Sequence, residues 1–202
     1  MLELRQQKLT EYILPSEMND TDNPLKYGKT EVEMDDKKIL EGKKLLIVDD
    51  EQDVRETLKD LLDMCAIDTA ADFQTAQKLL NQNKYDIAVL DIMGVKGYDL
   101  LEIANKKGVP ALMLTAHALS PDDFGKSISG GAKAYIPKEK MTEVAVFVAD
   151  VLKAQQGDEK PYKWFTRLKS FFEWKFGKEW LKTYREVREE AERRYGPFNN
   201  WE

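Results

Sequence analysis

The middle of the chain repeatedly alternates a short strand-like run, apolar in four of five cases, with a segment of helical periodicity. Five runs are expected to form strands, near residues 44–48, 67–70, 86–90, 110–114 and 133–136. Helices are expected near residues 53–65, 73–82, 97–107, 121–129 and 142–155. Short apolar runs that alternate with helices are typical of parallel strands. Because the connections are short and βαβ units wind right-handed, the pattern predicts an α/β fold with a doubly wound, five-stranded parallel sheet and helices on both faces.

Local signals support individual helices. Ser120 fits the N-cap position of the fourth helix, and Pro121 fits its first turn. Val144, Phe147 and Val151 recur at helical spacing and should form the buried stripe of the last helix.

Polar side chains follow four of the predicted strands. Asp49 and Asp50 follow the first strand, Asp91 the third, Thr115 the fourth, and Lys138 comes shortly after the fifth. Ligands in open parallel sheets bind outside the carboxyl ends of the strands, so these side chains should converge. Any one of the aspartates alone could equally be a turn former or a helix N-cap. All three together with a hydroxyl and an ammonium favour a site for Mg²⁺ and a phosphoryl group, because hard oxygen ligands suit Mg²⁺.

These residues make the middle of the chain recognisable: residues 43–156 resemble the receiver domain of two-component response regulators. The resemblance covers somewhat more than half of the chain. It rests on the order, spacing and strand-end placement of four fragments: VDDE at 48–51, LDIM at 90–93, LTA at 114–116 and GAKAYIPK at 131–138. It implies a flavodoxin-like sheet with strand order 2-1-3-4-5.

The resemblance also implies roles at the acidic cluster. Asp91 corresponds to the phosphoacceptor. Asp49 and Asp50 correspond to the acid pair that holds Mg²⁺, together with Asp91 and the backbone carbonyl of Met93. The phosphoryl donor would be a sensor histidine kinase or a phosphotransfer protein.

Three further residues match the family pattern. Lys138 corresponds to the ammonium that pairs with Asp91 and then with the phosphoryl oxygens. Thr115 corresponds to the switch hydroxyl, and Tyr135 to the aromatic ring that turns inward when Thr115 moves.

The chain departs from the family pattern in the loops around the site. Glu139 stands where the family usually has Pro after the conserved Lys, and Val95 stands where it has Pro four residues after the phosphoacceptor. The stretch from Asp91 to Thr115 is a few residues shorter than is common. Residues 93–97 are therefore expected to form a tighter, glycine-rich turn.

Residues 1–42 are expected to be an acidic arm and linker. They carry ten acidic and six basic side chains. A mobile arm is one interpretation, and a helix that docks on the body or on a partner is the other.

Residues 157–202 form a different kind of segment, with all four Trp and 12 of the 20 aromatic residues of the chain. One broad helical face carries most of the apolar residues: Trp164, Phe165, Leu168, Phe171, Phe172 and Phe176. A second helix is expected from about 178 to 195, so the tail should be a helical hairpin. It contains no recognised output module and no clear DNA-binding module.

Three interpretations of this tail remain open. It packs on the receiver domain or on a second subunit in a homodimer, or it is an element that docks an unknown protein partner and is released or captured on phosphorylation. Contact with a membrane surface or a nucleic acid is the third, because residues 160–182 interleave seven basic side chains with aromatic ones. The acidic remainder of the chain opposes this third interpretation.

Composition excludes several other classes of protein. The net charge of −6 argues against non-specific nucleic-acid binding by the whole chain. A single cysteine, Cys65, excludes an internal disulfide framework and is expected to be a buried structural thiol, with a redox role as the alternative. No apolar run approaches the length of a membrane span, and the first thirty residues do not resemble a signal peptide, so we expect a cytoplasmic protein.

The leading hypothesis is a signalling protein that is not an enzyme: a receiver domain whose phosphorylation on Asp91 controls dimerisation or partner docking. The alternative is a receiver-fold scaffold that does not switch and assembles through its aromatic tail. A phosphohydrolase that uses Asp91 as nucleophile is disfavoured, because no second general acid accompanies it. His117, the single histidine, is expected to be a solvated loop residue or a partner contact rather than a phosphohistidine or metal ligand.

Overall fold

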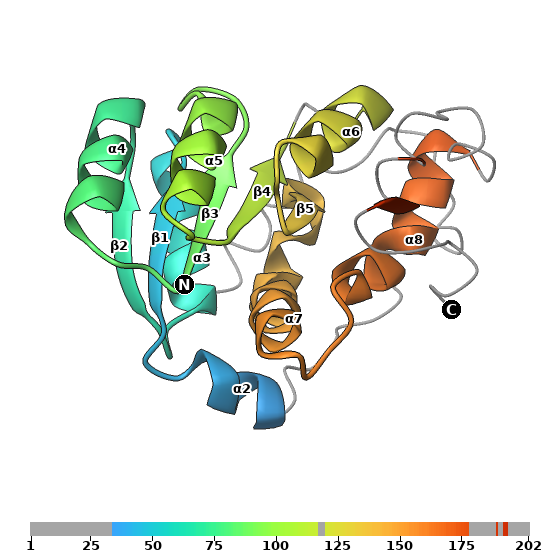
Figure 1. Ribbon diagram of the computed structural model, residues 1–202, viewed down its shortest axis with the longest axis horizontal. Coiled ribbons are helices and arrows are strands. Elements are labelled where there is room, and N and C mark those ends of the chain that lie inside the picture. The colour runs from blue at the N-terminus through green and yellow to red at the C-terminus, as the bar shows by residue number, and fades with distance from the viewer. Residues whose placement is uncertain (1–33, 117–119, 178–188, 190–191, 194–202) are drawn as a thin grey trace.

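The five apolar runs form the strands of one parallel sheet (Figure 1). The computed structural model describes residues 34–116, 120–177, 189 and 192–193. The strands are β1 Lys44–Val48, β2 Ala66–Ala70, β3 Ile87–Asp91, β4 Ala111–Thr115 and β5 Ala134–Pro137. The strand order β2-β1-β3-β4-β5 confirms the predicted fold class.

Strand pairing places the polar residues at one edge of the sheet. All residues of β3 and β4 are buried, as expected for central strands that are covered on both faces. Val48 of β1 pairs with Leu90 of β3, and Asp91 pairs with Leu114 of β4. The residues that follow β1, β3 and β4 therefore meet at the carboxyl ends of neighbouring strands.

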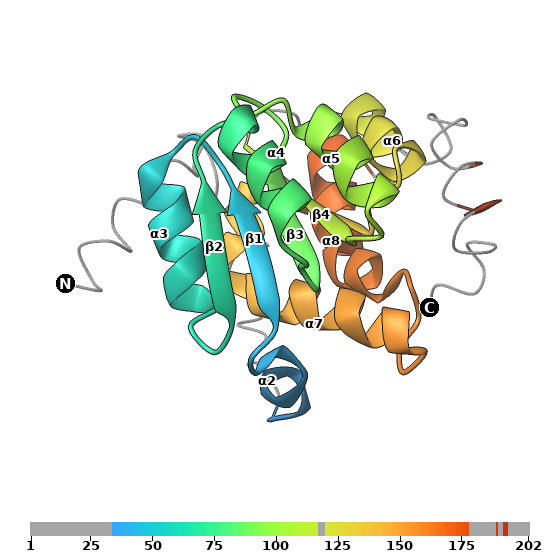
Figure 2. The same ribbon diagram turned by 60° about the vertical axis from the view of Figure 1, so that its left-hand side comes forward.

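Helices cover both faces of the sheet (Figures 1 and 2). α3 and α7 lie on one face, and α4, α5 and α6 lie on the other. Their bounds are α3 Gln52–Leu61, α4 Phe73–Gln82, α5 Gly97–Lys106, α6 Pro121–Ser129 and α7 Val144–Gln156. The expected N-cap of α6 is present, because the Ser120 hydroxyl accepts the backbone N–H of Asp123 at 3.0 Å.

Two helix bounds differ from the prediction by more than one residue. α3 ends at Leu61 rather than near 65, because Leu62 leaves the helical region of backbone angles (φ −119°, ψ 31°) before the chain turns into β2. α7 begins two residues later than expected, because a 3-10 helix, η1 Lys138–Glu143, precedes it.

One further helix, α2 Met34–Leu40, lies within the segment expected to be an arm. α2 packs against α7, with Leu40 fully buried. Asp36 of α2 accepts a hydrogen bond from the Lys153 ammonium of α7 at 2.6 Å. Residues 34–40 are thus a docked helix, whereas the rest of the predicted arm, residues 1–33, lies outside the described residues.

The aromatic tail begins with α8, Lys163–Phe176, which lies beside β5 at the end of the sheet (Figure 1). Five of the six residues of the predicted apolar face are buried: Trp164, Phe165, Leu168, Phe171 and Phe172. Most of the predicted second helix, and with it the hairpin, lies outside the described residues.

Candidate functional site

The structure brings three aspartates together at the carboxyl ends of β1 and β3. Each of Asp49, Asp50 and Asp91 offers a carboxylate oxygen, and these oxygens lie within 4.8 Å of one another. Asp49 and Asp91 are buried, whereas Asp50 is exposed at the mouth of the cluster. The convergence follows from the parallel pairing of β1 with β3, since both strands end at the same edge.

Lys138 supplies the positive charge, because it directly follows β5 and points back towards the acids. Its Nζ lies 2.8 Å from Asp49 Oδ2 and 3.1 Å from Asp91 Oδ1. A third carboxylate also shares this ammonium, with Glu51 Oε1 at 2.8 Å. Sequence reasoning quoted Glu51 as part of a motif but gave it no role; its position next to the acid pair was the available signal.

Burial dominates the electrostatics of the cluster. Burial, reinforced by the Asp49 charge, raises the pKa of the Asp91 carboxyl to about 6, although Lys138 opposes the shift. Burial also raises the pKa of Asp49. Burial lowers the pKa of Lys138, but hydrogen bonds to Asp49 and Glu51 outweigh it and hold that pKa above its usual range. One ammonium thus serves three carboxylates, and added positive charge at this place would stabilise the ionised acids.

The donor set fits a hard divalent cation. All the side-chain donors of the cluster are carboxylate oxygens, which Mg²⁺ prefers over nitrogen or sulfur ligands. Asp49 Oδ2 is enclosed by protein, and its charged neighbour is the Lys138 ammonium at 2.8 Å, which it shares with Asp91 and Glu51. The site therefore places several oxygen donors within reach of a single ion. The negative charge of its carboxylates is only partly neutralised by Lys138.

The loop after β3 is the tight, glycine-rich turn that was expected from residues 93–97. Gly94 has φ +69°, and a Cβ placed on it would lie 2.4 Å from Asp50 Oδ2. A Cβ on Gly97 would lie 2.0 Å from the Asp91 backbone oxygen. Both glycines therefore allow the loop to approach the acidic cluster more closely than any other residue would.

Val95 and Met93 take opposite positions in this turn. Val95, at the place of the family's usual Pro, is fully buried, whereas the Met93 side chain is 60% exposed. The Met93 carbonyl accepts the Val95 N–H at 2.6 Å, which leaves one lone pair for a cation. Its role as a backbone ligand stays a prediction.

Thr115 and Tyr135 are in direct contact beside the acidic cluster. Thr115 is fully buried at the end of β4, next to Leu114, which pairs with Asp91. Its side chain is hydrogen-bonded to the Tyr135 hydroxyl, and the Tyr135 ring is fully buried as well. Burial raises the pKa of Tyr135, so its hydroxyl stays protonated at physiological pH. The Tyr135 ring is thus enclosed by protein, and its role as a switch stays a prediction, while His117 lies outside the described residues.

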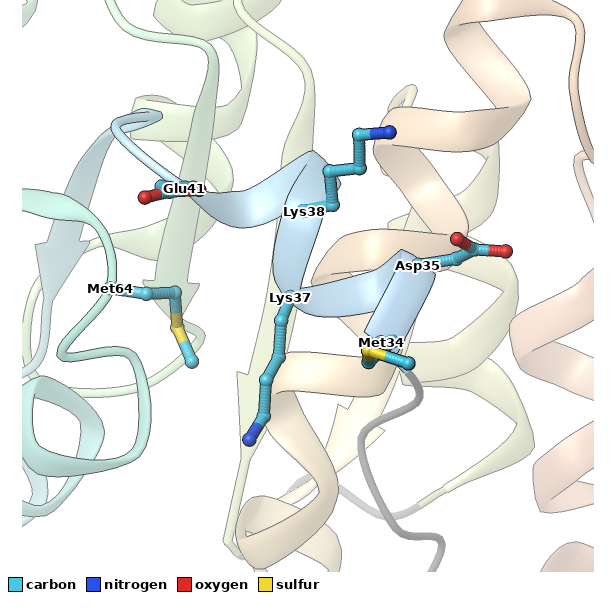
Figure 3. A pocket seen from close by; sticks show the side chains of 6 residues that line it. All are labelled: Met34, Asp35, Lys37, Lys38, Glu41 and Met64. Atoms are coloured by element: carbon cyan, nitrogen blue, oxygen red, sulfur yellow. The ribbon is translucent and has the colours of Figure 1, made fainter.

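A hollow in the described part of the chain lies beside α2, near the amino end of β1 and away from the acids (Figure 3). Its lining mixes charges of both signs with two methionines: Met34, Asp35, Lys37, Lys38, Glu41 and Met64. The labelled side chains point in different directions rather than towards a common centre. Nothing in this arrangement suggests chemistry.

The described helices include none that is both long and apolar enough to cross a membrane.

Comparison with known proteins agrees with this geometry. A family profile described as the response regulator receiver domain matches residues 45–147, which is just over half of the 202 residues. The two-component response regulator ARR10 of Arabidopsis thaliana is 35% identical over 104 residues, covering 48% of this chain and 19% of that protein. The probable transcriptional regulator ycf27 of Guillardia theta is 39% identical over 103 residues, covering 47% of this chain and 39% of that protein.

Solved structures show the same fold. A response regulator receiver domain protein (CheY-like) from Methanospirillum hungatei JF-1 superposes with a TM-score of 0.53 and 27% identity, covering 58% of this chain and 98% of that chain. The chain spans well under half the length of the two curated relatives named above.

Proposed function

The chain belongs to the response regulator receiver domain family, and on that basis we propose that it accepts a phosphoryl group on Asp91 in a Mg²⁺-dependent reaction. Family membership makes it a signalling domain of a two-component system. The observation that carries the finer proposal is the convergence of Asp49, Asp50 and Asp91 with Lys138 at one edge of the sheet.

Asp49, Asp50 and Asp91, with the Met93 carbonyl, would hold the ion. When bound, Mg²⁺ supplies positive charge that offsets the repulsion between the acids and an incoming phosphoryl group. The positive charge of the ion would stabilise the ionised Asp49 carboxylate in particular, because Asp49 is buried and shares Lys138 with two other carboxylates.

Asp91 acts as the nucleophile. Although burial raises its pKa to about 6, this carboxyl remains mainly ionised at pH 7. A carboxylate oxygen of Asp91 attacks the phosphorus of a phosphohistidine on the donor, so that an O–P bond forms as the P–N bond breaks. The electron pair of that bond and a proton from solvent pass to the imidazole nitrogen, which balances the reaction.

Lys138 and Thr115 receive the transferred group. Lys138 Nζ already lies 3.1 Å from Asp91 Oδ1, so a small movement brings it against a phosphoryl oxygen. Thr115, at the end of the neighbouring strand, donates its hydroxyl proton to another phosphoryl oxygen. Both interactions favour the product state and position the phosphoryl group in the cluster.

The donor we propose is a sensor histidine kinase or a phosphotransfer protein. The scaffold alternative assembles through the aromatic tail, which requires an aromatic surface that a second molecule can reach. In the described part of the tail the aromatic face of α8 is instead buried on this chain, with Trp174, 44% exposed, as its most accessible large apolar residue. This burial favours a signalling role over assembly through α8.

The test is covalent labelling of the full chain with a small acyl phosphate donor, with and without Mg²⁺. We expect a phosphoryl adduct in the intact-mass spectrum that requires Mg²⁺ and is removed by hydroxylamine, as an acyl phosphate is. Asp91→Asn should abolish the adduct. Asp158→Asn, which changes an exposed aspartate beyond α7, is the matched control and should keep it. An adduct that persists in Asp91→Asn would show that the phosphoacceptor is another residue.

A further inference from the structure

The loop between β1 and α3, which carries Asp49 and Asp50, is fixed by several main-chain hydrogen bonds. The Asp49 N–H donates to the Ala70 carbonyl of β2 at 3.2 Å. The Glu51 N–H donates to Asp49 Oδ1 at 3.0 Å, so one carboxylate oxygen is fixed as well. The Glu51 carbonyl accepts the Arg55 N–H of α3 at 3.2 Å. None of these contacts uses the backbone carbonyls of Asp49 and Asp50.

The Arg55 side chain holds these two carbonyls with one nitrogen atom. Its Nη1 donates to the Asp49 oxygen at 2.7 Å and to the Asp50 oxygen at 3.0 Å. That nitrogen carries two N–H groups, so each carbonyl can receive its own hydrogen bond. The two carbonyls belong to the peptide groups on either side of the Asp50 Cα, and each peptide group is planar. Fixing both planes therefore sets φ and ψ of Asp50 and, with them, the direction of its Cα–Cβ bond.

The Asp50 carboxylate depends on its backbone for its direction more than its two neighbours do. Lys138 Nζ lies 2.8 Å from Asp49 Oδ2 and 3.1 Å from Asp91 Oδ1. Asp50 is exposed, and among the described residues no hydrogen bond or ion pair holds its carboxylate. Its place within 4.8 Å of the other two acids therefore relies on the backbone that Arg55 fixes.

Arg55 acts on the cluster through the backbone rather than through its charge. Burial and then Lys138 are the leading influences on the pKa of Asp49, and burial and then the Asp49 charge on the pKa of Asp91. Arg55 is not among the leading causes of either shift. Its side-chain hydrogen bonds go to main-chain oxygens, so it occupies no carboxylate lone pair that a cation could use.

We propose that Arg55 is a positioning residue for the cation site, because it fixes the backbone that directs the Asp50 carboxylate towards Asp49 and Asp91. The inference rests on the proposed function, in which these three acids hold Mg²⁺. Without Arg55 the two peptide groups can rotate, and the Asp50 carboxylate spends less time within reach of a shared ion. Residues that orient metal ligands typically contribute about 10–100-fold to metal affinity. We expect the lower end, because Mg²⁺ keeps several waters and depends on few carboxylates.

Charge and positioning predict opposite results when Arg55 is replaced. A guanidinium repels a divalent cation, so through charge alone its removal would tighten Mg²⁺ binding. Loss of the two backbone contacts should instead weaken binding. Arg55→Met keeps an unbranched side chain and removes both the charge and every donor, so the sign of the change in affinity tells which effect dominates.

Calorimetric titration of the full chain with Mg²⁺ measures this change. Arg55→Met should raise the dissociation constant about tenfold. Lys59→Met is the matched control, since it removes an exposed cation from the same helix, and it should bind Mg²⁺ as the unmodified chain does. Amide exchange supplies a readout without metal: the Glu51 amide should exchange faster in Arg55→Met, with amides of α4, on the other face of the sheet, as the reference.

Arg55→Lys is the conservative variant. It keeps the charge and an ammonium that can donate to the carbonyls, but its side chain is shorter. It should lose about one of the two hydrogen bonds and weaken Mg²⁺ binding about threefold. If Arg55→Met does not fold, as judged by circular dichroism, Arg55→Lys decides the question alone.

The outcomes separate this inference from the proposed function. Weaker Mg²⁺ binding in the Arg55 variant, with normal binding in Lys59→Met, supports the inference. Unchanged or tighter binding in the Arg55 variant, or equal weakening in Lys59→Met, overturns it and leaves the proposed function intact. Absence of Mg²⁺ binding by the unmodified chain overturns the Mg²⁺-dependent function, and the inference falls with it.

Discussion

Replacing Arg167 by Gln should destabilise the fold by about 3 kcal/mol at pH 8, because it leaves the Asp150 carboxylate buried without its cation. Asp150 of α7 is 2% exposed and receives two hydrogen bonds from the Arg167 guanidinium of α8, at 2.7 Å and 3.1 Å. Removing one partner of a fully buried pair typically costs 3–5 kcal/mol. We take the lower end, because the Arg167 side chain is itself 26% exposed and water can partly replace it.

The effect should shrink at low pH. Burial raises the pKa of Asp150 even with Arg167 present, and without Arg167 that pKa should be higher still. The folded state then binds the proton more tightly than the unfolded chain, whose aspartates titrate near about 3.9. The stability that protonation of Asp150 contributes is therefore fully present below the pKa of the unfolded chain. It is lost as the pH rises through the higher pKa of the folded state. The loss caused by Arg167→Gln should be full at pH 8 and clearly smaller at pH 5.

Urea unfolding followed by circular dichroism at both pH values measures this loss. Arg167→Gln alone leaves the Asp150 carboxylate buried without a cation. The double variant Asp150→Asn with Arg167→Gln has no charge there, so it should be more stable than the single variant at pH 8. Lys169→Gln should change stability by less than about 0.5 kcal/mol. An Arg167→Gln variant that loses under about 1 kcal/mol, or loses equally at both pH values, would refute the assignment of this pair as a buried anchor.

Three further predictions use other contacts. Gly94→Ala should weaken Mg²⁺ binding at least about tenfold in a calorimetric titration, because its Cβ would fall 2.4 Å from Asp50 Oδ2 and its φ of +69° disfavours any side chain. Iodoacetamide should alkylate Cys65 about 100-fold more slowly than free cysteine at pH 8, since burial raises its pKa to about 11; the rate should keep rising with pH towards that value. Lys153→Gln should lower the free energy of unfolding by about 1–2 kcal/mol and speed amide exchange in α2, because it removes the 2.6 Å contact with Asp36.

The sheet and the convergence of its polar residues were predictable from sequence because both depend on local patterns. Each strand begins within one residue of its expected start, since short apolar runs that alternate with helical segments are typical of parallel strands. Once the strands are parallel and adjacent, Asp49 and Asp91 must meet at their carboxyl ends. The Ser120 cap depends on neighbouring residues alone and was equally accessible.

Contacts between elements distant in sequence were not predictable in the same way. Helical periodicity identified the apolar face of α8, but a periodic stripe does not say what covers it; that Phe172 rests on Phe124 and Tyr135 appears only in the structure. Glu51 was missed as a partner of Lys138 because its carboxylate becomes a neighbour only when β5 is placed next to the cluster.

The two flanks of the receiver domain are attached to the same turn of α7. Lys153 holds Asp36 of α2, and three residues earlier Asp150 holds Arg167 of α8. The Asp36 charge contributes to raising the pKa of Asp150, so the Asp36–Lys153 pair and the Asp150–Arg167 pair interact electrostatically. Residues in one such network do not contribute additively to stability. The stability effects of changes at Asp36 and at Arg167 are therefore expected to be non-additive, although the two residues lie on opposite flanks of the receiver domain.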